Sequence, residues 1–375
     1  MQIKNGLVFD LTEGFVSRNL YTEGTLISES SKDEVVIDAT DCYVIPGLVD
    51  LHFHGAVGED FSDASLEGLQ KIADFELSEG VTYICPAGMT LLEDQLTEIC
   101  KTTAEFRKKD TTGAEVVGIH LEGPFLCMAK KGAQNGDFLH DPDIDMLRRL
   151  NAASEGCVKL VTVAPEQPNG SEFVEKATKD GITVSLGHTV ATYDIASKAY
   201  AAGASHATHL YNGMPSFLHR EPSVIGAAFD AKHVKAEIIC DGIHVHEGAI
   251  RATFQLFIPE RMVLISDSLR ATGMPDGIYP FGGQEIEVHG NRATIAGHPE
   301  TLAGSVTSLM GCVRKAVEFG IPLADAVRAA TYNPAQQIKI ADRAGSLEVG
   351  KEASIVLLNK KDLSIKKIIF KGQIC

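Results

Sequence analysis

The sequence predicts an α/β fold, a (β/α)8 barrel of the TIM type that carries a small β-sandwich domain. Two observations predict the barrel. Short, β-branched apolar runs alternate with longer amphipathic segments, and eight such runs occur in the middle of the chain. A third observation predicts the small domain, because both ends of the chain hold short strand-like runs without helical periodicity. We therefore expect residues 1–45 and 345–375 to form the β-domain and residues 46–344 to form the barrel.

The expected elements follow in chain order. The terminal β-domain has expected strands at residues 7–9, 24–27, 35–37, 354–358 and 365–370. The eight barrel strands are expected at residues 44–49, 81–85, 116–119, 158–163, 182–186, 205–208, 234–239 and 262–265. Helices are expected between them at residues 66–79, 92–108, 144–151, 172–179, 193–202 and 247–256. Gly80, Gly181 and Gly203 each stand between a helix and the next strand, where helices commonly end.

Two gaps fit the alternation less well. Residues 210–232 show no clear helix, and residues 272–299 have the texture of a hairpin-like insertion after the last barrel strand. Helices are expected to resume at residues 305–319 and 323–331.

Composition narrows the classes of partner and compartment. The chain has 375 residues and a formal net charge of -16, which argues against a nucleic acid or an anionic membrane as partner. A small anionic substrate would need a local basic pocket. The eight cysteines are scattered without a CxxC pair, a pattern typical of reduced thiols. The first residues have no signal-peptide core and no apolar run is long enough to span a bilayer, so we expect a cytoplasmic protein.

Two histidines follow the first expected barrel strand. Residues i and i+2 of a strand point to the same side, so His52 and His54 can bind one metal ion together. Taken alone, the pair is equally compatible with a polar turn.

Five further barrel strands also run into metal-ligating residue types. The residues that follow these strands are His120 and Glu122, His188, His209, Asp241 and His244, and Asp267. Barrel enzymes place their chemistry at the C-terminal ends of the strands, and imidazole and carboxylate groups bind divalent metals. Singly, each residue could cap a strand by hydrogen bonding. Together they predict a site for one or two metal ions.

With these motifs the sequence resembles the amidohydrolase superfamily and, within it, the family of N-acetylglucosamine-6-phosphate deacetylases. The resemblance covers essentially the whole length. It rests on the segments 52–55, 120–125, 130–133, 187–189, 209–214, 241–244, 266–267 and 302–305. The segments 120–124 and 209–214 are specific to the deacetylase branch, whereas His-x-His marks only the superfamily.

The resemblance implies the metal ligands and the reaction. Glu122, His188 and His209 would hold the primary ion, and His52, His54 and Asp267 would hold a second one, with Glu122 as a bridge. One or two ions per subunit are expected, Zn²⁺ or Fe²⁺ first and Mn²⁺ or Co²⁺ as alternatives. The implied reaction is hydrolysis of the N-acetyl group of a phosphorylated amino sugar. Asp267 would be the catalytic residue that takes a proton from the attacking water and passes it to the leaving amine.

The resemblance also implies the substrate contacts. Arg220 and His244 would bind the phosphate, and Asn212 and Gly213 would supply hydrogen-bond donors. The other implied substrate-binding residues are Ala133, Gln134, Leu302, Ala303 and Gly304. Gln134 stands where some relatives have a histidine, and it would orient the acetyl carbonyl or the sugar. Arg220 crosses a dimer interface in some relatives, so a homodimer is implied; without the resemblance, Arg220 would be interpreted as a surface ion pair. His120, His206 and His246 are expected to be structural.

Three alternatives remain open from the sequence. The same chemistry could act on N-acetylgalactosamine 6-phosphate, which differs in the orientation of one hydroxyl group. Another amidohydrolase activity, on a different phosphorylated amide, is the second alternative. A non-catalytic scaffold that retained the barrel is the third, although such a protein would usually have lost ligands and none is missing here.

Overall fold

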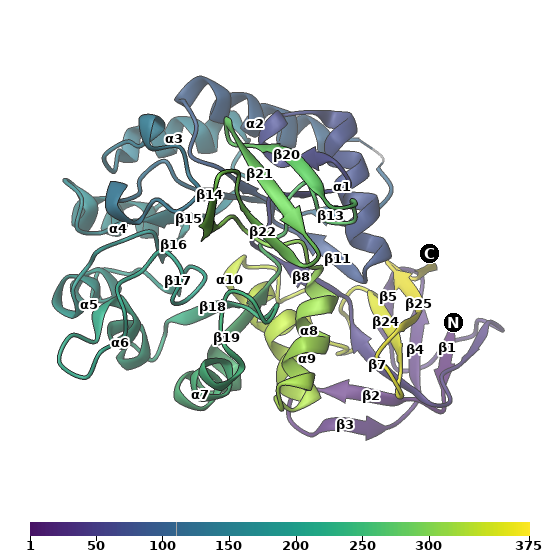
Figure 1. Ribbon diagram of the computed structural model, residues 1–375. Helices are drawn as coiled ribbons and strands as arrows, with labels where there is room; N and C mark the ends of the chain where they lie inside the picture. The colour runs from purple at the N-terminus through teal and green to yellow at the C-terminus, as the bar shows by residue number, and fades with distance from the viewer. Residues whose placement is uncertain (110) are drawn as a thin grey trace.

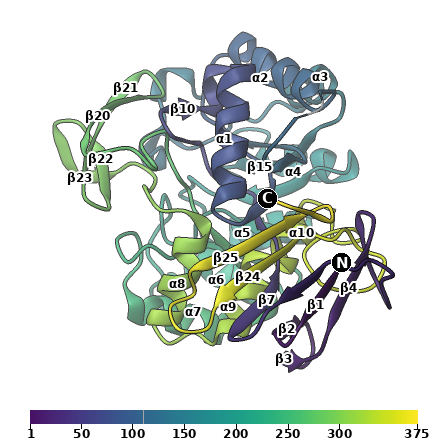
Figure 2. The same ribbon diagram turned by 90° about the vertical axis from the view of Figure 1, so that its right-hand side faces the viewer.

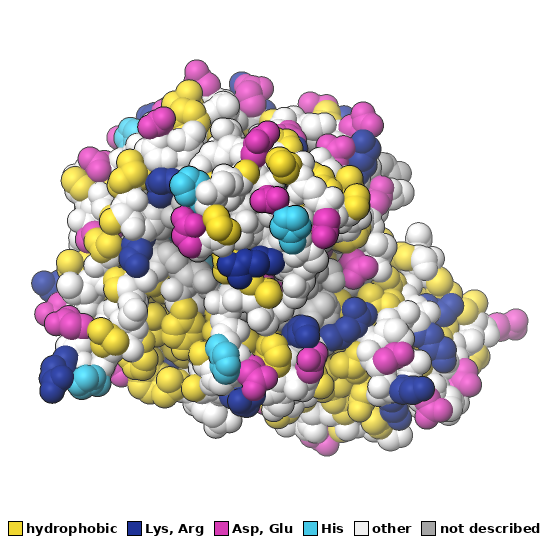
Figure 3. Space-filling model, in the orientation of Figure 1, with side chains coloured by type: hydrophobic (Ala, Val, Ile, Leu, Met, Phe, Trp, Pro, Cys, Tyr) yellow, Lys and Arg dark blue, Asp and Glu magenta, His cyan; other side chains and the backbone are white. Residues whose placement is uncertain are grey.

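The computed structural model describes residues 1–109 and 111–375. The protein is a mixed α/β structure in which a curled sheet of parallel strands is surrounded by helices, with further sheets at its margins (Figure 1). On the face shown in Figure 3, acidic and basic side chains are interspersed. Within the described residues, no helix combines the length and the apolar character needed to cross a membrane.

The parallel strands form the centre of the molecule. One sheet contains, in spatial order, β12 (Ala87–Gly88), β14 (Ile119–Glu122), β15 (Val158–Val163), β16 (Thr183–Leu186), β17 (His206–Ala207), β18 (Lys235–Ile239) and β19 (Met262–Ile265). A second contains β13 (Glu115–Val116), β11 (Val81–Ile84) and β8 (Leu48–Asp50). Beyond the ends of β8 and β19, the N–H of Asp267 donates to the carbonyl of His52 at 3.0 Å. This curled parallel arrangement is consistent with the predicted TIM-type barrel.

Helices cover the outside of the parallel strands. They are α1 (Leu66–Ser78), α2 (Glu93–Phe106), α3 (Ile144–Ala153), α4 (Gly170–Lys179), α5 (Tyr193–Ala201), α6 (Ser223–Asp230), α7 (Glu247–Phe257), α8 (Leu309–Glu318), α9 (Leu323–Ala330) and α10 (Tyr332–Gln337). Short 3-10 helices lie at η1 (Phe61–Asp63), η2 (Met128–Lys130), η3 (Gly136–Phe138) and η4 (Pro259–Arg261). Side-chain caps begin several helices: the Ser65, Thr192 and Ser308 hydroxyls each accept a hydrogen bond from a first-turn N–H.

Strands from the two ends of the chain form one mixed sheet, which contains both antiparallel and parallel neighbours. Its strands are, in order, β26 (Gln373–Ile374), β25 (Ile365–Phe370), β24 (Ile355–Asn359), β7 (Cys42–Pro46), β2 (Leu7–Asp10) and β3 (Gly14–Ser17). A neighbouring sheet contains β5 (Leu26–Ser28), β4 (Leu20–Glu23), β1 (Gln2–Lys4) and β6 (Val36–Asp38). Figure 2 shows the N-terminal and C-terminal strands side by side. Buried side chains from both ends, such as Ile3, Val44 and Leu357, share one hydrophobic cluster.

An antiparallel sheet follows the last parallel strand, where the sequence predicts a hairpin-like insertion. It contains β20 (Gly277–Phe281), β21 (Gln284–His289), β22 (Arg292–Ile295) and β23 (His298–Leu302) in consecutive order. The insertion is therefore a four-stranded meander rather than a single hairpin. A smaller pair, β9 (Gly55–Ala56) and β10 (Glu59–Asp60), follows the two histidines of the first parallel strand.

Two expected strands and one expected gap differ from the structure. The strand expected at residues 116–119 is divided into β13, which pairs with β11, and β14, which pairs with β12 and β15. The single strand expected at residues 44–49 is two strands, because β7 pairs with β2 and β24 whereas β8 pairs with β11. Gly47 separates them, and a Cβ atom there would lie 2.2 Å from the Thr82 hydroxyl oxygen. The gap at 210–232 does contain a helix, α6. Val224, Ile225, Ala227 and Ala228 are all buried, so α6 lacks the polar face that an amphipathic pattern needs.

Tyr83 connects the parallel strands to the C-terminal segment. Its buried hydroxyl donates to Glu352 Oε2 at 2.7 Å and lies 2.9 Å from Ser354 Oγ. We expect Tyr83→Phe to lower the free energy of unfolding by about 1.5–3 kcal/mol in urea denaturation, because a buried hydrogen bond to a charged group is lost. Tyr193→Phe removes an exposed hydrogen bond to Asp230 and is the matched control, with an expected loss below about 1 kcal/mol. Equal losses in the two variants would contradict the connecting role of Tyr83.

Candidate metal centre

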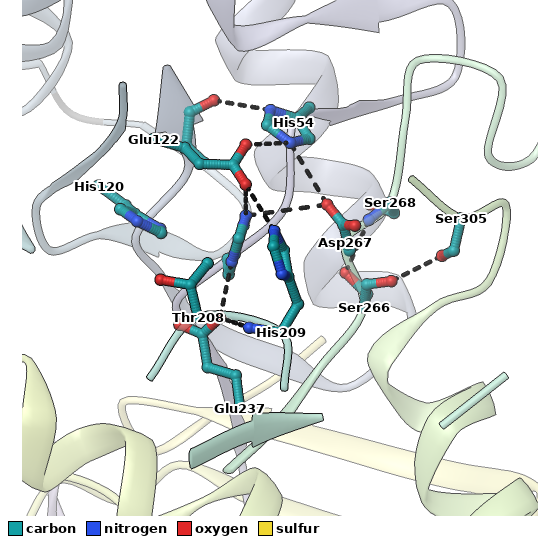
Figure 4. Close-up of polar contacts among 12 residues, drawn as sticks. His54, His120, Glu122, Thr208, His209, Glu237, Ser266, Asp267, Ser268 and Ser305 are labelled. Atoms are coloured by element: carbon teal, nitrogen blue, oxygen red, sulfur yellow. Dashed lines mark hydrogen bonds and ion pairs between the residues drawn. The ribbon is translucent and has the colours of Figure 1, made fainter. Parts of the chain in front are cut away.

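Six predicted ligands converge where the parallel strands end. His52 and His54 follow β8, Glu122 ends β14, and His188, His209 and Asp267 follow β16, β17 and β19. All six side chains belong to residues that are at most 6% exposed. Figure 4 shows Glu122, His54, His209 and Asp267 pointing toward one another. The residues that the sequence pattern predicts as metal ligands therefore lie together in the structure.

Glu122 lies at the centre of the cluster. Its Oε1 atom is 3.0 Å from both His188 Nε2 and His209 Nε2, and 3.3 Å from His52 Nε2. Its Oε2 atom is 3.2 Å from His54 Nε2. Asp267 Oδ1 lies 3.3 Å from His54 Nε2 and 3.8 Å from His52 Nε2. The four imidazole Nε2 atoms thus all face carboxylate oxygens.

The opposite ring nitrogens are held by hydrogen-bond acceptors. Nδ1 of His188 donates to the carbonyl of Lys130 at 2.8 Å, and Nδ1 of His209 donates to the carbonyl of Asn212 at 3.1 Å. Nδ1 of His54 donates to the carbonyl of Ala87 at 3.2 Å. A neutral imidazole that donates through Nδ1 has a free lone pair on Nε2. The rings are therefore oriented as metal ligands.

This donor set fits a divalent metal ion. Lone pairs face one another across the cluster, since His188 Nε2 and His209 Nε2 are 3.0 Å apart. His52 Nε2 is buried without a hydrogen-bond partner. Two sets, Glu122 with His188 and His209 and Glu122 with His52 and His54, each bring their ligand atoms within 4.8 Å of one another. Histidine and carboxylate ligands are typical of Zn²⁺ and related ions.

The pKa shifts of the clustered carboxylates and imidazoles also reflect how closely these groups are packed. Burial alone would raise the pKa of Glu122, but the charge of His52 and hydrogen bonds from His188 and His209 hold it well below its usual value. Burial alone would also raise the pKa of Asp267, but a hydrogen bond from His54 and the charges of His52 and His54 together lower it. Burial would lower the pKa of His54, but hydrogen bonds with Asp267 and Glu122 raise it to about 10. A divalent ion would displace the protons that these carboxylates attract to the rings.

Three of the six residues have backbone conformations that are uncommon for residues other than glycine. The φ angles of His188, His209 and Asp267 are +46°, +25° and +50°. Such strain persists only where the surroundings enforce it, and it concentrates at functional sites. Each strained residue lies two positions after the end of a parallel strand, and the turn there directs its side chain into the cluster.

A cavity of about 340 Å³ opens above the cluster. Most of the predicted substrate-binding residues line it, namely Ala133, Gln134, Asn212, Gly213, His244, Leu302 and Gly304. Ala303 is fully buried in a hydrophobic cluster with Leu269 and Phe281 and does not line the cavity. Because β23 ends at Leu302, the insertion forms one wall of the cavity.

Gln134 has a different immediate neighbourhood from the one expected. Its Nε2 donates to Glu122 Oε2 at 2.7 Å, and its Oε1 accepts from the N–H of Thr90 at 2.8 Å. The amide therefore contacts a candidate metal ligand while its residue still lines the cavity. One hydrogen of its NH₂ group is left for a substrate oxygen.

The two predicted phosphate-binding residues lie in different places. His244 lines the cavity, and its Nδ1 donates to Asp241 Oδ2 at 2.7 Å. Burial would lower the pKa of His244, but the hydrogen bond and charge of Asp241 raise it above its usual value. Arg220 is exposed, does not line the cavity of this chain, and donates to the ring of His219 at 2.7 Å.

Other residues near the centre have no individual role in the sequence analysis. Phe281, Glu300 and Thr301 line the cavity from the insertion. Glu237 lies beneath the cluster and contacts His52 and His206. Its only signal in the sequence is a carboxylate within the apolar run of β18.

Of the histidines expected to be structural, His246 caps α7, and Nε2 of His120 lies 2.8 Å from the Thr162 hydroxyl.

Comparisons with known proteins give a consistent set of relatives. Residues 43–375 match the model of the Amidohydrolase family. The chain is 35% identical over 376 residues to an N-acetylglucosamine-6-phosphate deacetylase of Bacillus subtilis (strain 168), covering 99% of this chain and 93% of that protein. It is 34% identical over 330 residues to an N-acetylgalactosamine-6-phosphate deacetylase of Escherichia coli O157:H7, covering 88% and 86%.

A solved structure is similar over the whole chain. It is a mutant N-acetyl-D-glucosamine-6-phosphate deacetylase from Mycobacterium smegmatis in complex with N-acetyl-D-glucosamine-6-phosphate. Its TM-score is 0.93 at 31% sequence identity, with 100% of this chain and 98% of that chain covered.

Replacing different ligands should have unequal effects on metal content. We expect His188→Ala to remove the more tightly held ion, because Glu122 Oε1 lies closest to His188 and His209. We expect the double variant His52→Ala/His54→Ala to retain that ion and lose only a second one. Elemental analysis after dialysis measures both. Only the tightly held ion withstands extended dialysis, so metal should remain in the double variant and be lost from His188→Ala; equal metal content in the two dialysed variants would contradict the ranking of the two ligand sets.

Proposed function

This chain belongs to the amidohydrolase family, and from that membership we propose that it is a metal-dependent hydrolase. It removes the N-acetyl group of N-acetylglucosamine 6-phosphate and produces glucosamine 6-phosphate and acetate. The observation that carries this proposal is one cavity that holds a buried His and carboxylate cluster beside a histidine suited to bind phosphate. The Bacillus subtilis relative, 35% identical over nearly the full length, supports the same reaction.

The proposed mechanism assigns proton transfer to Asp267. Glu122, His188 and His209, with His52 and His54, would hold the metal, which would polarise the amide carbonyl and make a water molecule easier to deprotonate. The lowered pKa of Asp267 supports an ionised carboxylate at neutral pH that can accept the proton of this water. Asp267 then passes the proton to the departing amine nitrogen. Gln134 holds Glu122 in place through the hydrogen bond to its Oε2 atom.

The proposed phosphate site depends on His244. The hydrogen bond from its Nδ1 to Asp241 favours the protonated ring, whose other N–H is a charged donor for a phosphate oxygen. The side-chain amide of Asn212 and the backbone N–H of Gly213 would complete the site, together with Arg220 from a second subunit, because the backbone N–H of Asn212 already donates to the carbonyl of His209. Leu302 and Gly304 also line the cavity and would contact the sugar, as would Ala133.

The number and identity of the ions are also part of the proposal. Two ligand sets that share Glu122 support a capacity for two ions per subunit, with Zn²⁺ or Fe²⁺ preferred and Mn²⁺ or Co²⁺ as alternatives. Elemental analysis of freshly purified protein tests this directly. Substoichiometric metal in active protein would contradict it.

A homodimer is proposed from the segment around Arg220. Phe217 and Leu218 are 45% and 56% exposed beside it, and apolar side chains of this size favour burial in an interface. A monomer in analytical ultracentrifugation would contradict this arrangement. We also propose a cytoplasmic location, which eight free cysteines, seven of them buried, support.

The finer description of the fold is proposed in the same way. Residues 46–344 would form a complete (β/α)8 barrel, and residues 1–45 and 345–375 would form a separate small β-sandwich domain. The hydrophobic cluster built from both chain ends supports this division. Limited proteolysis that cleaved first between the β-domain and the barrel would agree with it, and first cleavage within the barrel would not.

The galacto epimer is the competing substrate. A relative that acts on N-acetylgalactosamine 6-phosphate is 34% identical to this chain, nearly the same as the 35% of the gluco relative. Since overall identity does not separate the two, the residues that contact the sugar must decide the preference.

Acetate release from both phosphorylated sugars tests the proposed function. We expect the kcat/KM for N-acetylglucosamine 6-phosphate to exceed the values for N-acetylgalactosamine 6-phosphate and for unphosphorylated N-acetylglucosamine. Asp267→Asn is the matched inactive control, with kcat lowered by about 10²–10⁴-fold because the proton acceptor is lost. Equal or inverted preference between the epimers would overturn the gluco assignment. No acetate release from any of the three by metal-loaded protein would overturn the hydrolase itself.

The Asp241–His244 pair makes a prediction about pH. Asp241 raises the pKa of His244, so Asp241→Asn should lower it and make the ring neutral at a lower pH. We expect the variant's KM for the phosphorylated sugar to exceed the native KM most at pH values between the pKa of His244 in the variant and its pKa in the native protein. At lower pH, His244 is protonated in both proteins, and the two KM values should approach each other. The KM for unphosphorylated N-acetylglucosamine is the control and should not change with the substitution. A pH-independent increase in KM would contradict a role for the charge of His244.

A further inference from the structure

A fully buried carboxylate lies beneath the metal-facing side chains. Glu237 stands in the middle of β18 and is 0% exposed (Figure 4). Its Oε2 atom accepts hydrogen bonds from Nδ1 of His52 at 2.8 Å and from the N–H of His209 at 2.9 Å. Its Oε1 atom lies 2.9 Å from Nε2 of His206. Among the described residues no Lys or Arg pairs with it, so imidazole and amide groups alone offset the cost of burying its charge.

The contact with His52 fixes which nitrogen can bind a metal. An ionised carboxylate only accepts hydrogen bonds, so Nδ1 of His52 carries the hydrogen and Nε2 keeps its lone pair. That Nε2 faces Glu122 Oε1 at 3.3 Å and has no hydrogen-bond partner although it is buried. A carboxylate behind a histidine is a common way to orient a metal ligand. His52 is the one metal-facing histidine whose Nδ1 is held by a side chain, because carbonyl groups hold those of His54, His188 and His209.

The same residue also supports His209 through the backbone. His209 has a φ angle of +25°, which is unfavourable for a residue with a Cβ atom. Its N–H is bound to Glu237 Oε2, and the N–H of Leu210 donates to the Glu237 carbonyl at 2.8 Å. These two hydrogen bonds enforce the strained turn that directs the His209 ring toward Glu122.

We propose that Glu237 is a positioning residue of the metal centre, which orients His52 by its side chain and His209 by its backbone contacts. The proposal rests on the metal site of the proposed function, and it is independent of which sugar is hydrolysed. It assigns to β18 a role beyond that of a barrel strand, because a hydrogen-bond acceptor at position 237 links ligands of both sets.

Two conservative variants separate the reach of this side chain from its charge. Glu237→Asp keeps the charge but withdraws the carboxylate by about 1.5 Å, the length of one carbon–carbon bond. Glu237→Gln keeps the reach, since its Oε1 can still accept from His52 and His209. Its NH₂ group would face His206, whose Nδ1 has no partner, so that ring can change tautomer and accept the new hydrogen bond.

The test is a Co²⁺ titration of chelator-treated full-length protein, followed by visible absorbance and calorimetry. We expect Glu237→Asp to raise the Kd of the more weakly bound ion by about 10- to 100-fold. We expect Glu237→Gln to bind both ions with nearly native affinity. Glu76→Asp is the matched control, because Glu76 is another carboxylate only 1% exposed, on α1, and its substitution should leave Co²⁺ binding unchanged. A cooperative thermal unfolding transition of each metal-free variant is the control that shows the variant to be folded.

The titration contains no sugar, so a failed deacetylase assay and a failed positioning role give different results. Native Co²⁺ affinity in folded Glu237→Asp would overturn the proposal, as would a loss in Glu237→Gln equal to that in Glu237→Asp. A His52→Ala background gives a second measurement. Adding Glu237→Asp to it should cause little further loss of the weaker ion if Glu237 acts on that ion through His52. A fully additive loss would overturn this route.

Discussion

Acceptor groups are packed against one another in a buried space at the ends of the parallel strands, and the rest of the site depends on this. Glu122 Oε1 lies within 3.0–3.3 Å of three imidazole Nε2 atoms. Carboxylate charge and ring lone pairs repel one another at these distances unless protons or a cation lie between them. Divalent ions held by the two ligand sets that share Glu122 would satisfy these groups. The proposed hydrolytic chemistry follows from the same requirement, since the ion that stabilises the cluster would also activate the amide carbonyl.

The fold maintains this arrangement with contacts behind the ligands. Backbone carbonyls hold the Nδ1 atoms of His54, His188 and His209, and Glu237 holds that of His52. Positive φ angles at the residues that follow three strands turn their side chains inward. These features are costly in a protein without a function at this place, because strained backbone and a buried carboxylate both oppose folding. Their concentration around one cluster is the strongest physical indication that the centre is functional.

The proposed recognition of the substrate depends on parts of the chain outside the parallel strands. The insertion after β19 supplies Phe281, Glu300, Thr301 and Leu302 to the cavity, and the loop after β17 supplies Asn212 and Gly213. The insertion supplies part of the cavity wall and none of the six candidate metal ligands, whereas the loop after β17 supplies both His209 and part of the wall. Loop positions can vary without disturbing the ligands. Relatives of nearly equal identity to this chain, 35% and 34%, carry names that refer to different epimers.

The sequence by itself determined the alternation of strands and helices, and it identified six residues that the structure brings together at the strand ends. The C-terminal ends of parallel strands lie at the same edge of the sheet. Residues that follow successive strands can therefore be recognised from the sequence as neighbours in the structure. It could not separate β7 from β8, because one apolar run serves two sheets. It did not find α6, whose buried surface leaves no helical period. Nor did it indicate that Gln134 contacts Glu122 or that Glu237 holds His52, a partner 185 positions away in the chain. Only the tertiary structure decides such contacts, because the role of a buried polar side chain depends on its hydrogen-bond partners, and these partners come from strands that are distant in the sequence.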